Sequence, residues 1–365
     1  MKFNLLHNGT VAFPELIRRI KETESSIQIK MFVWRDDAIG NELLRQLKDA
    51  ADRGVRITIW KDRFAEVLEK GEENKQSLFH KPFRASTLLG AMILDFAYPM
   101  NKPKGYRQKP NPLLETFLSH ENVVVHKDAD LKDHTKFFIF DDRTVVFGGI
   151  NVEDKEYTED YLHRRYHDYM IETTSEAFVE TLRARVFDGA KDDGSDPCLA
   201  LNRQGVFEIP ASMRTMFRTA KERIIVTMAY FGAKDAFDGL CEAASRGVKI
   251  DILTSKRANL QPDYNRKFLQ ELYALHPEQV TIRLSEDMIH AKAVLADDVL
   301  SIGSANLNNR GYQYLGELNL VTRDKDLIEQ YLASREEEAV RAAIVRDPAQ
   351  LDYVRWKAFL ERYGM

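Results

Sequence analysis

Two segments of the chain repeat one pattern of hydrophobic and polar positions. Residues 27–34 and 224–230 are apolar, strand-like runs, and each is followed by an amphipathic helical pattern. The sequences that end these helices and continue into the next strand, residues 50–59 and 243–252, correspond position by position. The pattern therefore predicts a strand, a helix and a second strand, twice in one chain.

The two helices are predicted from apolar residues that recur on one face. These residues are Leu43, Leu44, Leu47 and Ala50 in the first copy and Phe237, Leu240, Ala243 and Ala244 in the second. Gly54 and Gly247 each follow a basic residue at the helix end, where a left-handed backbone stops a helix at low cost. A repeated order of strand, helix and strand is typical of an α/β fold with two similar halves.

The boundary between the halves is predicted from Gly189 to Pro197, a stretch rich in Gly, Asp and Pro. This gives an N-terminal half of residues 1–192 and a C-terminal half of residues 193–365. The second half ends in amphipathic helical patterns, which we expect to form a C-terminal cap. A second repeated motif, described below, lies farther from its helix in the first half. We therefore place an insertion at residues 63–122.

Composition limits the classes of function. The 365 residues are 44% hydrophobic and 30% charged, which provides enough apolar surface for buried cores and rules out a disordered chain. The formal net charge of -4 means that attraction to nucleic acid or to an anionic membrane has to be local.

Localisation is predicted from what the sequence lacks. Only two cysteines are present and no secretion signal is recognisable, which favours a reducing cytoplasm. The best candidate for a membrane span, Leu88–Tyr98, is too short and contains Asp95. We therefore expect a cytoplasmic protein that can make peripheral contact with the inner face of the cell membrane.

A second repeat carries the reactive side chains, because the string His-x-Lys, four residues, Asp occurs twice before a Gly-rich turn and an Asn. The first copy comprises His134, Lys136, Asp141, Gly148, Gly149 and Asn151, and the second comprises His290, Lys292, Asp297, Gly303, Ser304 and Asn306. The second copy has one residue fewer between Asp and Gly, which predicts a tighter turn. A single His-x-Lys pair is usually a half-exposed strand edge, but two copies with matched Asp, Gly and Asn favour a functional site.

These residue types favour phosphodiester chemistry. One imidazole can attack as a neutral nucleophile while the other donates a proton to the leaving oxygen. The lysines and asparagines suit a phosphoryl group whose equatorial oxygens carry charge. A metal is disfavoured, because each His has an ammonium group two residues away and no cysteine cluster or HExxH string is present. His163 and His167 stand at i and i+4 and could bind zinc, the alternative being a solvated helix face or an active-site rim.

With its duplicated His-x-Lys-x4-Asp motif and the Gly and Asn downstream, the sequence resembles the phospholipase D superfamily. The segment Asn8-Gly9-Thr10, the pair Asp36-Asp37 and both Arg-Gly-Val sequences look like those of bacterial members of the cardiolipin synthase type. The resemblance implies two halves, each a mixed β-sheet flanked by helices, related by a pseudo-twofold axis with one active site between them. It also implies a covalent phosphohistidine intermediate, no metal and no other cofactor.

The resemblance assigns roles residue by residue. His134 matches the nucleophile, and His290 matches the general acid that later becomes the base. The positions that hold the phosphate match Lys136, Lys292, Asn151 and Asn306, with Gly149 and Ser304 beside them. The acidic residues that orient the imidazoles match Asp168 and Glu317, because a carboxylate on one ring nitrogen fixes the tautomer. For Asp141 and Asp297 we expect a structural role.

The insertion bears most directly on the choice of substrate. From Asn74 to Pro110, Asp95 is the only acidic residue, and an apolar stretch lies between basic flanks. This pattern suits docking at an anionic lipid surface, with candidates Lys81, Arg84, Leu88, Leu89, Ile93, Phe96, Lys102 and Lys104. The alternative is a buried helix with solvated ends. Nucleic acid is a less favoured partner, because few aromatic residues are interleaved with the charges.

Three functions remain open on the sequence. The first is a phosphatidyltransferase or phospholipase D that acts on anionic phospholipids, of the cardiolipin synthase kind. Transfer and hydrolysis differ only in whether an alcohol or water reaches the intermediate, and the sequence favours neither. The second is a metal-independent nuclease or other phosphodiesterase that uses the same site. The third is a non-catalytic lipid-binding protein. The acceptor alcohol and the oligomeric state are not predicted.

Overall fold

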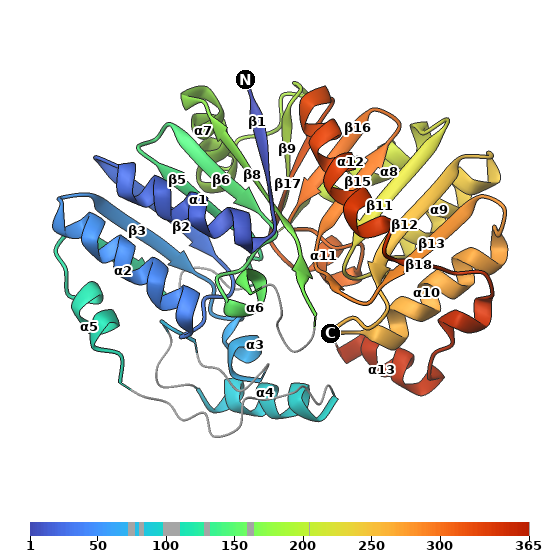
Figure 1. The fold of residues 1–365 in the computed structure, drawn as a ribbon, viewed down its shortest axis with the longest axis horizontal. Coiled ribbons are helices and arrows are strands. Elements are labelled where there is room, and N and C mark those ends of the chain that lie inside the picture. The colour runs from blue at the N-terminus through green and yellow to red at the C-terminus, as the bar shows by residue number, and fades with distance from the viewer. Residues whose placement is uncertain are drawn as a thin grey trace. The chain divides into compact units, whose positions relative to one another are not determined.

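A computed structural model describes residues 1–71, 77–79, 84–97, 110–127, 132–158, 164–203 and 205–364, with the backbone alone for residues 71, 94–97, 363 and 364. The described chain forms two compact units (Figure 1). The first unit groups residues 1–2, 6–165 and 170–183, and the second groups residues 3–5, 166–169 and 184–365. Residues 166–169 therefore group with the second unit, although they lie within the N-terminal half of the sequence.

The first unit contains the predicted repeat as β2 (Ser26–Met31), α2 (Ala38–Asp52) and β3 (Arg56–Lys61). The described part of the predicted insertion contains three helices, and two of them, α3 and α4, pack against each other. The remaining elements are β1 (Phe3–His7), α1 (Gly9–Glu22), α3 (Glu66–Gly71), α4 (Ala85–Ala97), α5 (Pro112–Leu118), β4 (Val123–His126), β5 (Phe137–Phe140), β6 (Thr144–Gly148), α6 (Asp154–Tyr157), β8 (Tyr169–Thr174) and α7 (Glu176–Arg183).

The second unit contains the other copy of the repeat as β11 (Arg223–Met228), α9 (Lys234–Ser245) and β12 (Lys249–Ser255). Its chain ends in the predicted helices, of which the last packs on α10. The remaining elements are β7 (Tyr166–His167), η2 (Ala184–Asp188), β9 (Cys198–Arg203), β10 (Val206–Phe207), α8 (Glu208–Thr219), α10 (Pro262–Leu275), β13 (Val280–Ser285), β14 (Met288–Ile289), β15 (Lys292–Ala296), β16 (Val299–Gly303), α11 (Asn309–Gln313), β17 (Glu317–Thr322), α12 (Lys325–Ala339), β18 (Ala343–Ile344), η3 (Pro348–Leu351) and α13 (Arg355–Gly364).

The two large sheets have the same internal topology. The first has the strand order β1-β8-β6-β5-β2-β3-β4, and the second contains the matching order β9-β17-β16-β15-β11-β12-β13, extended at its ends by β10 and β18. In both, the strands of the repeat pair in parallel, whereas the strand after the His motif pairs antiparallel to its neighbours. The predicted α/β fold with two similar halves and mixed sheets is confirmed.

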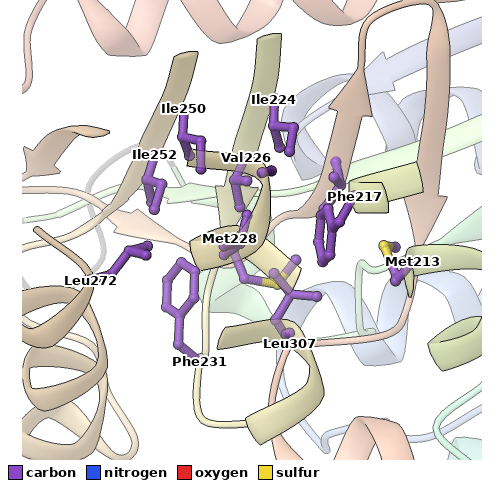
Figure 2. Close-up of a cluster of buried hydrophobic side chains, with 14 of the residues drawn as sticks. Met213, Phe217, Ile224, Val226, Met228, Phe231, Ile250, Ile252, Leu272 and Leu307 are labelled. Carbon is purple, nitrogen blue, oxygen red and sulfur yellow. The ribbon is translucent and has the colours of Figure 1, made fainter. Parts of the chain in front are cut away.

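Each sheet buries one face against helices through the apolar stripes that the sequence predicts. In the second unit, Figure 2 shows Ile224 and Val226 of β11 and Ile250 and Ile252 of β12 among the side chains of one buried cluster. Phe217 of α8 lies in the same cluster. In the first unit, Ile27, Ile29, Ile57 and Ile59 occupy equivalent strand positions and pack with Leu43, Leu44 and Leu47 of α2. This repeated core gives each half a rigid sheet on which to place its motif.

Two turns have the backbone that the sequence predicts. Gly54 and Gly247 adopt φ values of 97° and 91° just after α2 and α9, in the left-handed region that suits glycine.

The hairpin turns that follow the two His motifs differ in length. The turn between β5 and β6 spans residues 141–143, whereas the turn between β15 and β16 spans only residues 297–298. The residue that the second motif lacks is therefore missing from this turn, and the strand pairing on either side is preserved.

Candidate active site

The first motif lies at the start of β5, in the first unit. His134 is 8% exposed, and its ring makes an edge-to-face contact with Phe32, with the ring centroids 4.6 Å apart. Lys136 is fully buried, and its ammonium group donates a hydrogen bond of 2.7 Å to the backbone carbonyl of His134. The same ammonium lies 5.5 Å from the centroid of Phe32. Phe32, at the end of β2, therefore contacts both functional side chains of this motif.

Charged groups fix the backbone that leads into His134. Asp133 forms an ion pair of 2.7 Å with Lys30, and its N–H donates a hydrogen bond of 2.8 Å to Oδ2 of Asp62. Burial raises the pKa of Asp62 to about 6, although the N–H of Asp133 and the charge of Lys61 act in the opposite direction. Burial alone would also raise the pKa of Asp133, but Lys30 and hydrogen bonds from Thr135 outweigh it and keep that pKa low.

The predicted phosphate-binding residues downstream of the first His motif lie beyond the end of β6. Gly149 and Asn151 are both buried. The side-chain carbonyl of Asn151 accepts a hydrogen bond of 3.3 Å from the N–H of Val33, which follows β2. This contact leaves the amide nitrogen as the donor that Asn151 can offer to a ligand.

In the second motif, one carboxylate is in contact with both functional side chains. Oδ2 of Asp168 lies 2.9 Å from Nδ1 of His290 and 2.9 Å from Nζ of Lys292. The Lys292 ammonium also donates a hydrogen bond to the carbonyl of His290. All three side chains belong to the second unit and are buried. The structure thus brings together three residues that the sequence proposes for the site.

The environment of Asp168 favours its ionised form. Burial by itself raises the pKa of Asp168, but the Lys292 ammonium and the His290 imidazole outweigh this effect and keep the pKa below its ordinary value. The other carboxylate oxygen accepts a hydrogen bond of 2.8 Å from the N–H of Tyr169. Because Asp168 contacts Nδ1 of His290, the opposite ring nitrogen, Nε2, is the one oriented away from this carboxylate and suited to proton transfer.

Glu317, the second predicted orienting acid, is fully buried at the start of β17. Its carboxylate accepts a hydrogen bond of 2.5 Å from the hydroxyl of Ser304, which in turn accepts one of 3.0 Å from the N–H of Leu318. The N–H of Ser304 donates to the carbonyl of Leu318. These contacts tie Ser304 to Glu317, and the phosphate-binding role that the sequence predicts for Ser304 stays a prediction.

Asn306 carries an acceptor that is poised for a ligand. The residue is 6% exposed, and its Oδ1 atom is buried without a hydrogen-bond partner among the residues that the structure describes. Leaving a buried amide oxygen unpaired costs about 1–3 kcal/mol. A hydrogen-bond donor of a bound molecule would offset this cost, whereas the predicted phosphate-holding role of Asn306 would use its amide nitrogen, the donor of this side chain.

The two motif aspartates have matching structural contacts. Asp297 accepts hydrogen bonds of 2.8 to 3.0 Å from three consecutive backbone N–H groups, those of Lys221, Glu222 and Arg223. Asp141 accepts equivalent bonds from Glu24, Ser25 and Ser26. Both aspartates have positive φ, 50° for Asp141 and 51° for Asp297, a conformation that Asp tolerates in a tight turn. These contacts tie each motif turn to the chain that enters β2 or β11 and support the predicted structural role.

His167 has partners that the sequence does not reveal. Its Nε2 atom lies 3.0 Å from Glu338 of α12 and 3.3 Å from Asp287, which precedes β14. These three side chains place one nitrogen and two oxygens within 4.8 Å of one another, a set that could hold a cation. Arg341 also pairs with Glu338, so this carboxylate has a second partner within the unit. The zinc pair considered with His163 is not tested, because His163 lies outside the described residues.

The segment that carries Asp168 is fixed by its backbone as well. Strand β7 pairs in parallel with β14, and the N–H of His290 donates a hydrogen bond of 2.8 Å to the carbonyl of His167. Asp168 directly follows β7, so the pairing of β7 with β14 fixes the backbone beside the contacts of Asp168 with His290 and Lys292.

The candidate membrane-docking residues lie on and around α4. Leu88, Leu89 and Ile93 are 41%, 61% and 62% exposed, rather than buried as the alternative interpretation expects. Arg84 is exposed just before the helix. Lys81, Lys102 and Lys104, together with the side chain of Phe96, lie outside what the structure describes. In the described part of the chain, no helix has the length and apolar character needed to cross a bilayer.

Comparison with known proteins agrees with the fold. A family model described as "Cardiolipin synthase, PLD-like domain" matches residues 16–188 and 213–337. Cardiolipin synthase A of Pseudomonas syringae pv. syringae is 25% identical over 358 residues, which cover 90% of this chain and 66% of the relative. Cardiolipin synthase A of Edwardsiella ictaluri is 23% identical over 375 residues, covering 95% of this chain and 71% of the relative. The chain thus spans about two-thirds of the length of these relatives.

Solved structures show the same fold at low sequence identity. Phosphatidylserine synthase of Haemophilus influenzae Rd KW20 superposes with a TM-score of 0.73 and 14% identity, covering 99% of this chain and 92% of its own. Polyphosphate kinase of Porphyromonas gingivalis gives a TM-score of 0.60 and 15% identity, with 52% of its chain covered. The fold and the duplicated motif therefore define a phospholipase D-like protein. More specifically, the chain belongs to the family of cardiolipin synthase PLD-like domains.

Proposed function

We propose that the protein is a phosphatidyltransferase of the cardiolipin synthase kind, which acts on the phosphodiester bond of an anionic phospholipid. The observation that carries the proposal is the contact of Asp168 with both His290 and Lys292, at 2.9 Å each. A buried carboxylate between an imidazole and an ammonium stabilises a protonated imidazole and fixes the ring. Membership of a family whose relatives are named cardiolipin synthase A supports the choice of lipid.

The proposed reaction has two displacements at phosphorus. In the first, a ring nitrogen of His134 attacks the phosphorus, the P–O bond to glycerol breaks, and His290 gives its proton to the leaving oxygen. In the second, neutral His290 takes the proton of an acceptor alcohol, the alcohol oxygen bonds to phosphorus, and the P–N bond to His134 breaks. Lys136 and Lys292 would neutralise the phosphoryl oxygens in both steps. The proposal requires that both imidazoles reach one phosphorus atom.

The proposed role of Lys292 is supported by how its charge is held. Its ammonium is buried between the Asp168 carboxylate and the carbonyl of His290, so it is oriented before substrate binds. Preorganised charge of this kind stabilises a transition state without reorganisation during the reaction. Lys136 has the corresponding bond to the carbonyl of His134.

The proposed location is a lipid surface, reached partly through α4. Leu88, Leu89 and Ile93 present exposed apolar side chains on this helix, and Arg84 adds a positive charge at its start. Exposed aliphatic side chains beside cations suit contact with anionic headgroups. We propose peripheral association with the inner face of the cell membrane.

The test is to incubate the purified full chain with phosphatidylglycerol vesicles in EDTA and to resolve the lipids. Cardiolipin together with free glycerol is the expected result. Phosphatidic acid as the sole product would mean that the protein hydrolyses the lipid and does not transfer it. Unchanged lipid together with cleaved single-stranded DNA would mean that the protein is a nuclease. Mass spectrometry of acid-sensitive adducts is expected to locate the phosphatidyl group on the peptide that contains His134.

Two variants test whether both histidines take part in the reaction. His134→Ala and His290→Ala are each expected to lower turnover by at least about 10³-fold, because each removes a group that takes part directly in bond breaking. His276→Ala, at the end of α10, is the matched control and is expected to keep full turnover. Full activity in a double variant of His134 and His290 would overturn the mechanism.

A further inference from the structure

The last helix, α13, carries an exposed apolar stripe. Trp356, Phe359 and Leu360 are 63%, 62% and 57% exposed, although burial on the rest of the unit is the usual outcome for such side chains. They stand at positions i, i+3 and i+4, so they form one continuous face of the helix. The sequence pattern predicts a packing cap here, and the structure shows that only the other face of α13 serves as one.

The opposite face of α13 is firmly attached to the second unit. Ala358 and Glu361 are buried, and Glu361 accepts a hydrogen bond of 2.7 Å from the N–H of Tyr264 at the start of α10. The chain that enters the helix is fixed as well, because the N–H of Val354 donates a hydrogen bond of 2.8 Å to Asp263. These contacts hold the buried face of α13 on the second unit, and the apolar stripe stays exposed.

Cations border this stripe on both sides. At about 100° per residue, Trp356, Phe359 and Leu360 centre on a direction nearly opposite to that of Ala358 and Glu361. Exposed cations lie between the two faces, with Lys357 on one side and Arg355 and Arg362 on the other. Glu361 is the only acidic residue of the helix, and its carboxylate is bound at the buried face. The exposed surface of α13 is therefore apolar at its centre and positive along its edges.

We propose that α13 is an interfacial helix that lies in the headgroup region of an anionic bilayer. The stripe of Trp356, Phe359 and Leu360 enters the acyl-chain boundary, while Lys357, Arg355 and Arg362 extend to the lipid phosphates. Long basic side chains reach the interface from the sides of a helix in this way. Trp suits this depth, because its ring is apolar and its N–H is polar.

Charge complementarity selects the lipid surface over a second copy of the chain. Cations along both edges of the stripe would face each other in a symmetric contact between two copies and repel, since an isologous contact pairs a patch with itself. An anionic bilayer has the opposite charge at every edge of the stripe. The inference rests on the proposed function to the extent that an enzyme acting on bilayer lipids needs a surface that holds it there. It adds a lipid contact in the second unit to the one proposed for α4.

Trp356 provides a direct readout that does not depend on catalysis. The chain has three tryptophans, of which Trp34 is fully buried and Trp60 partly buried. With vesicles of phosphatidylglycerol and brominated phosphatidylcholine, we expect quenching of tryptophan emission in the wild type. The conservative variant Trp356→Phe is expected to bind the same vesicles but to lose most of this quenching. Quenching that is equal in both proteins would overturn the proposal.

Binding itself is tested by sedimentation with phosphatidylglycerol-containing vesicles. The variant W356S/F359S/L360S is expected to bind at least about tenfold more weakly, because it removes the apolar area that enters the lipid. The variant K357E/R362E is expected to bind about tenfold more weakly and to lose most of its salt dependence. Val340→Ser, which alters an equally exposed apolar residue of the same unit, and Lys234→Glu, which alters an exposed cation, are the matched controls and are expected to bind as the wild type does.

Three further outcomes separate this inference from its alternatives. A double variant, His134→Ala with His290→Ala, is expected to bind and to be quenched normally, so failure of the proposed reaction leaves the docking test intact. The triple serine variant is expected to lose turnover on vesicles but to keep it on monomeric short-chain phosphatidylglycerol. If the serine variant instead abolishes a dimer seen by sedimentation velocity and leaves vesicle binding unchanged, α13 is an interface between copies and the proposal is wrong.

Discussion

Oδ2 of Asp168 lies 2.9 Å from Nδ1 of His290, and the same oxygen lies 2.9 Å from the ammonium of Lys292. One carboxylate atom therefore holds both the imidazole and the cation of the second motif. Asp168 precedes β8 in sequence, but it groups with the second unit together with the rest of residues 166–169. A short segment of the N-terminal half thus completes the motif of the C-terminal half.

The first prediction concerns this carboxylate. Asp168→Asn is expected to lower kcat by about 10²- to 10⁴-fold, because a neutral amide neither stabilises the imidazolium of His290 nor orients the Lys292 ammonium. Turnover of phosphatidylglycerol vesicles measures the loss, and thermal melting reports whether the fold persists. Asp251→Asn, which removes an acid paired with Arg283 and Arg335 in the same unit, is the control. Near-normal turnover in Asp168→Asn, or an equal loss in the control, would contradict the role assigned to Asp168.

The second prediction concerns the structural aspartates. Asp297→Asn is expected to reduce the free energy of unfolding by about 1–3 kcal/mol, because three backbone N–H groups lose a charged acceptor. Burial alone would raise the pKa of Asp297. The hydrogen bonds from its backbone donors lower the pKa by more than burial raises it, so the pKa lies below its ordinary value. The stabilisation is therefore present above the unfolded pKa of about 4 and is lost as the pH falls through the folded value.

Urea unfolding at about pH 7 and again below about pH 4 checks this. The difference in unfolding free energy between the wild type and Asp297→Asn is expected to be smaller at the lower pH. Asp298→Asn changes the adjacent, largely exposed residue and serves as the control. A gap of constant size across this pH range would show that the carboxylate charge is not what stabilises the turn.

Much of the fold follows from the sequence because its signals are local and repeated. The apolar stripes of α2 and α9, the glycines at their ends and the shortened turn after Asp297 depend on neighbouring residues, so their spacing predicts them. The contact between Asp168 and His290 could be anticipated only from the family resemblance. No periodicity in the sequence links a residue of the N-terminal half to a motif of the C-terminal half.

Other features depend on tertiary packing and have no sequence signal. The pattern of Trp356, Phe359 and Leu360 is the same whether a helix buries that stripe or exposes it, so the sequence favours a cap and the structure exposes the stripe. Ser304 matches a phosphate-binding position by spacing, yet its hydroxyl is bound to Glu317. In both cases the decisive fact is which group lies nearby in space, and that is fixed by other elements.

The third prediction uses the raised pKa of Asp62. Burial raises this pKa to about 6, so the folded protein binds the proton more tightly than the unfolded chain does. The resulting stabilisation is fully present below about pH 4 and is lost as the pH rises through about 6. Because the pKa rises from about 4 in the unfolded chain to about 6 in the folded protein, this loss of unfolding free energy is on the order of 3 kcal/mol.

Asp62→Asn removes this dependence, since an amide does not titrate. Between about pH 4 and pH 7, the wild type is expected to lose on the order of 3 kcal/mol of unfolding free energy relative to the variant. Urea titrations across this range measure the difference, with Asp142→Asn, an exposed position of the same unit, as the control. Parallel stability profiles for wild type and Asp62→Asn would mean that the carboxylate titrates at its ordinary pKa.

The fourth prediction concerns His167 as a positioning residue for Asp168. The imidazole lies 3.0 Å from Glu338 and 3.3 Å from Asp287, and its backbone carbonyl accepts the N–H of His290. His167→Ala is expected to cost about 1–3 kcal/mol of stability, because the buried Glu338 carboxylate loses one hydrogen-bond partner and keeps Arg341. It is also expected to lower kcat between about 10- and 100-fold with little change in KM, because Asp168 is held less accurately against His290.

A second variant separates positioning from stability in this cluster. Adding Glu338→Gln to His167→Ala removes the buried charge and is expected to restore most of the melting temperature, while kcat stays low because strand β7 has still lost its side-chain anchor. Chemical shifts of the His290 ring provide the readout, since they report its contact with Asp168 directly. If kcat recovers together with stability in the double variant, His167 stabilises the fold without positioning the catalytic groups, and its role in the reaction is excluded.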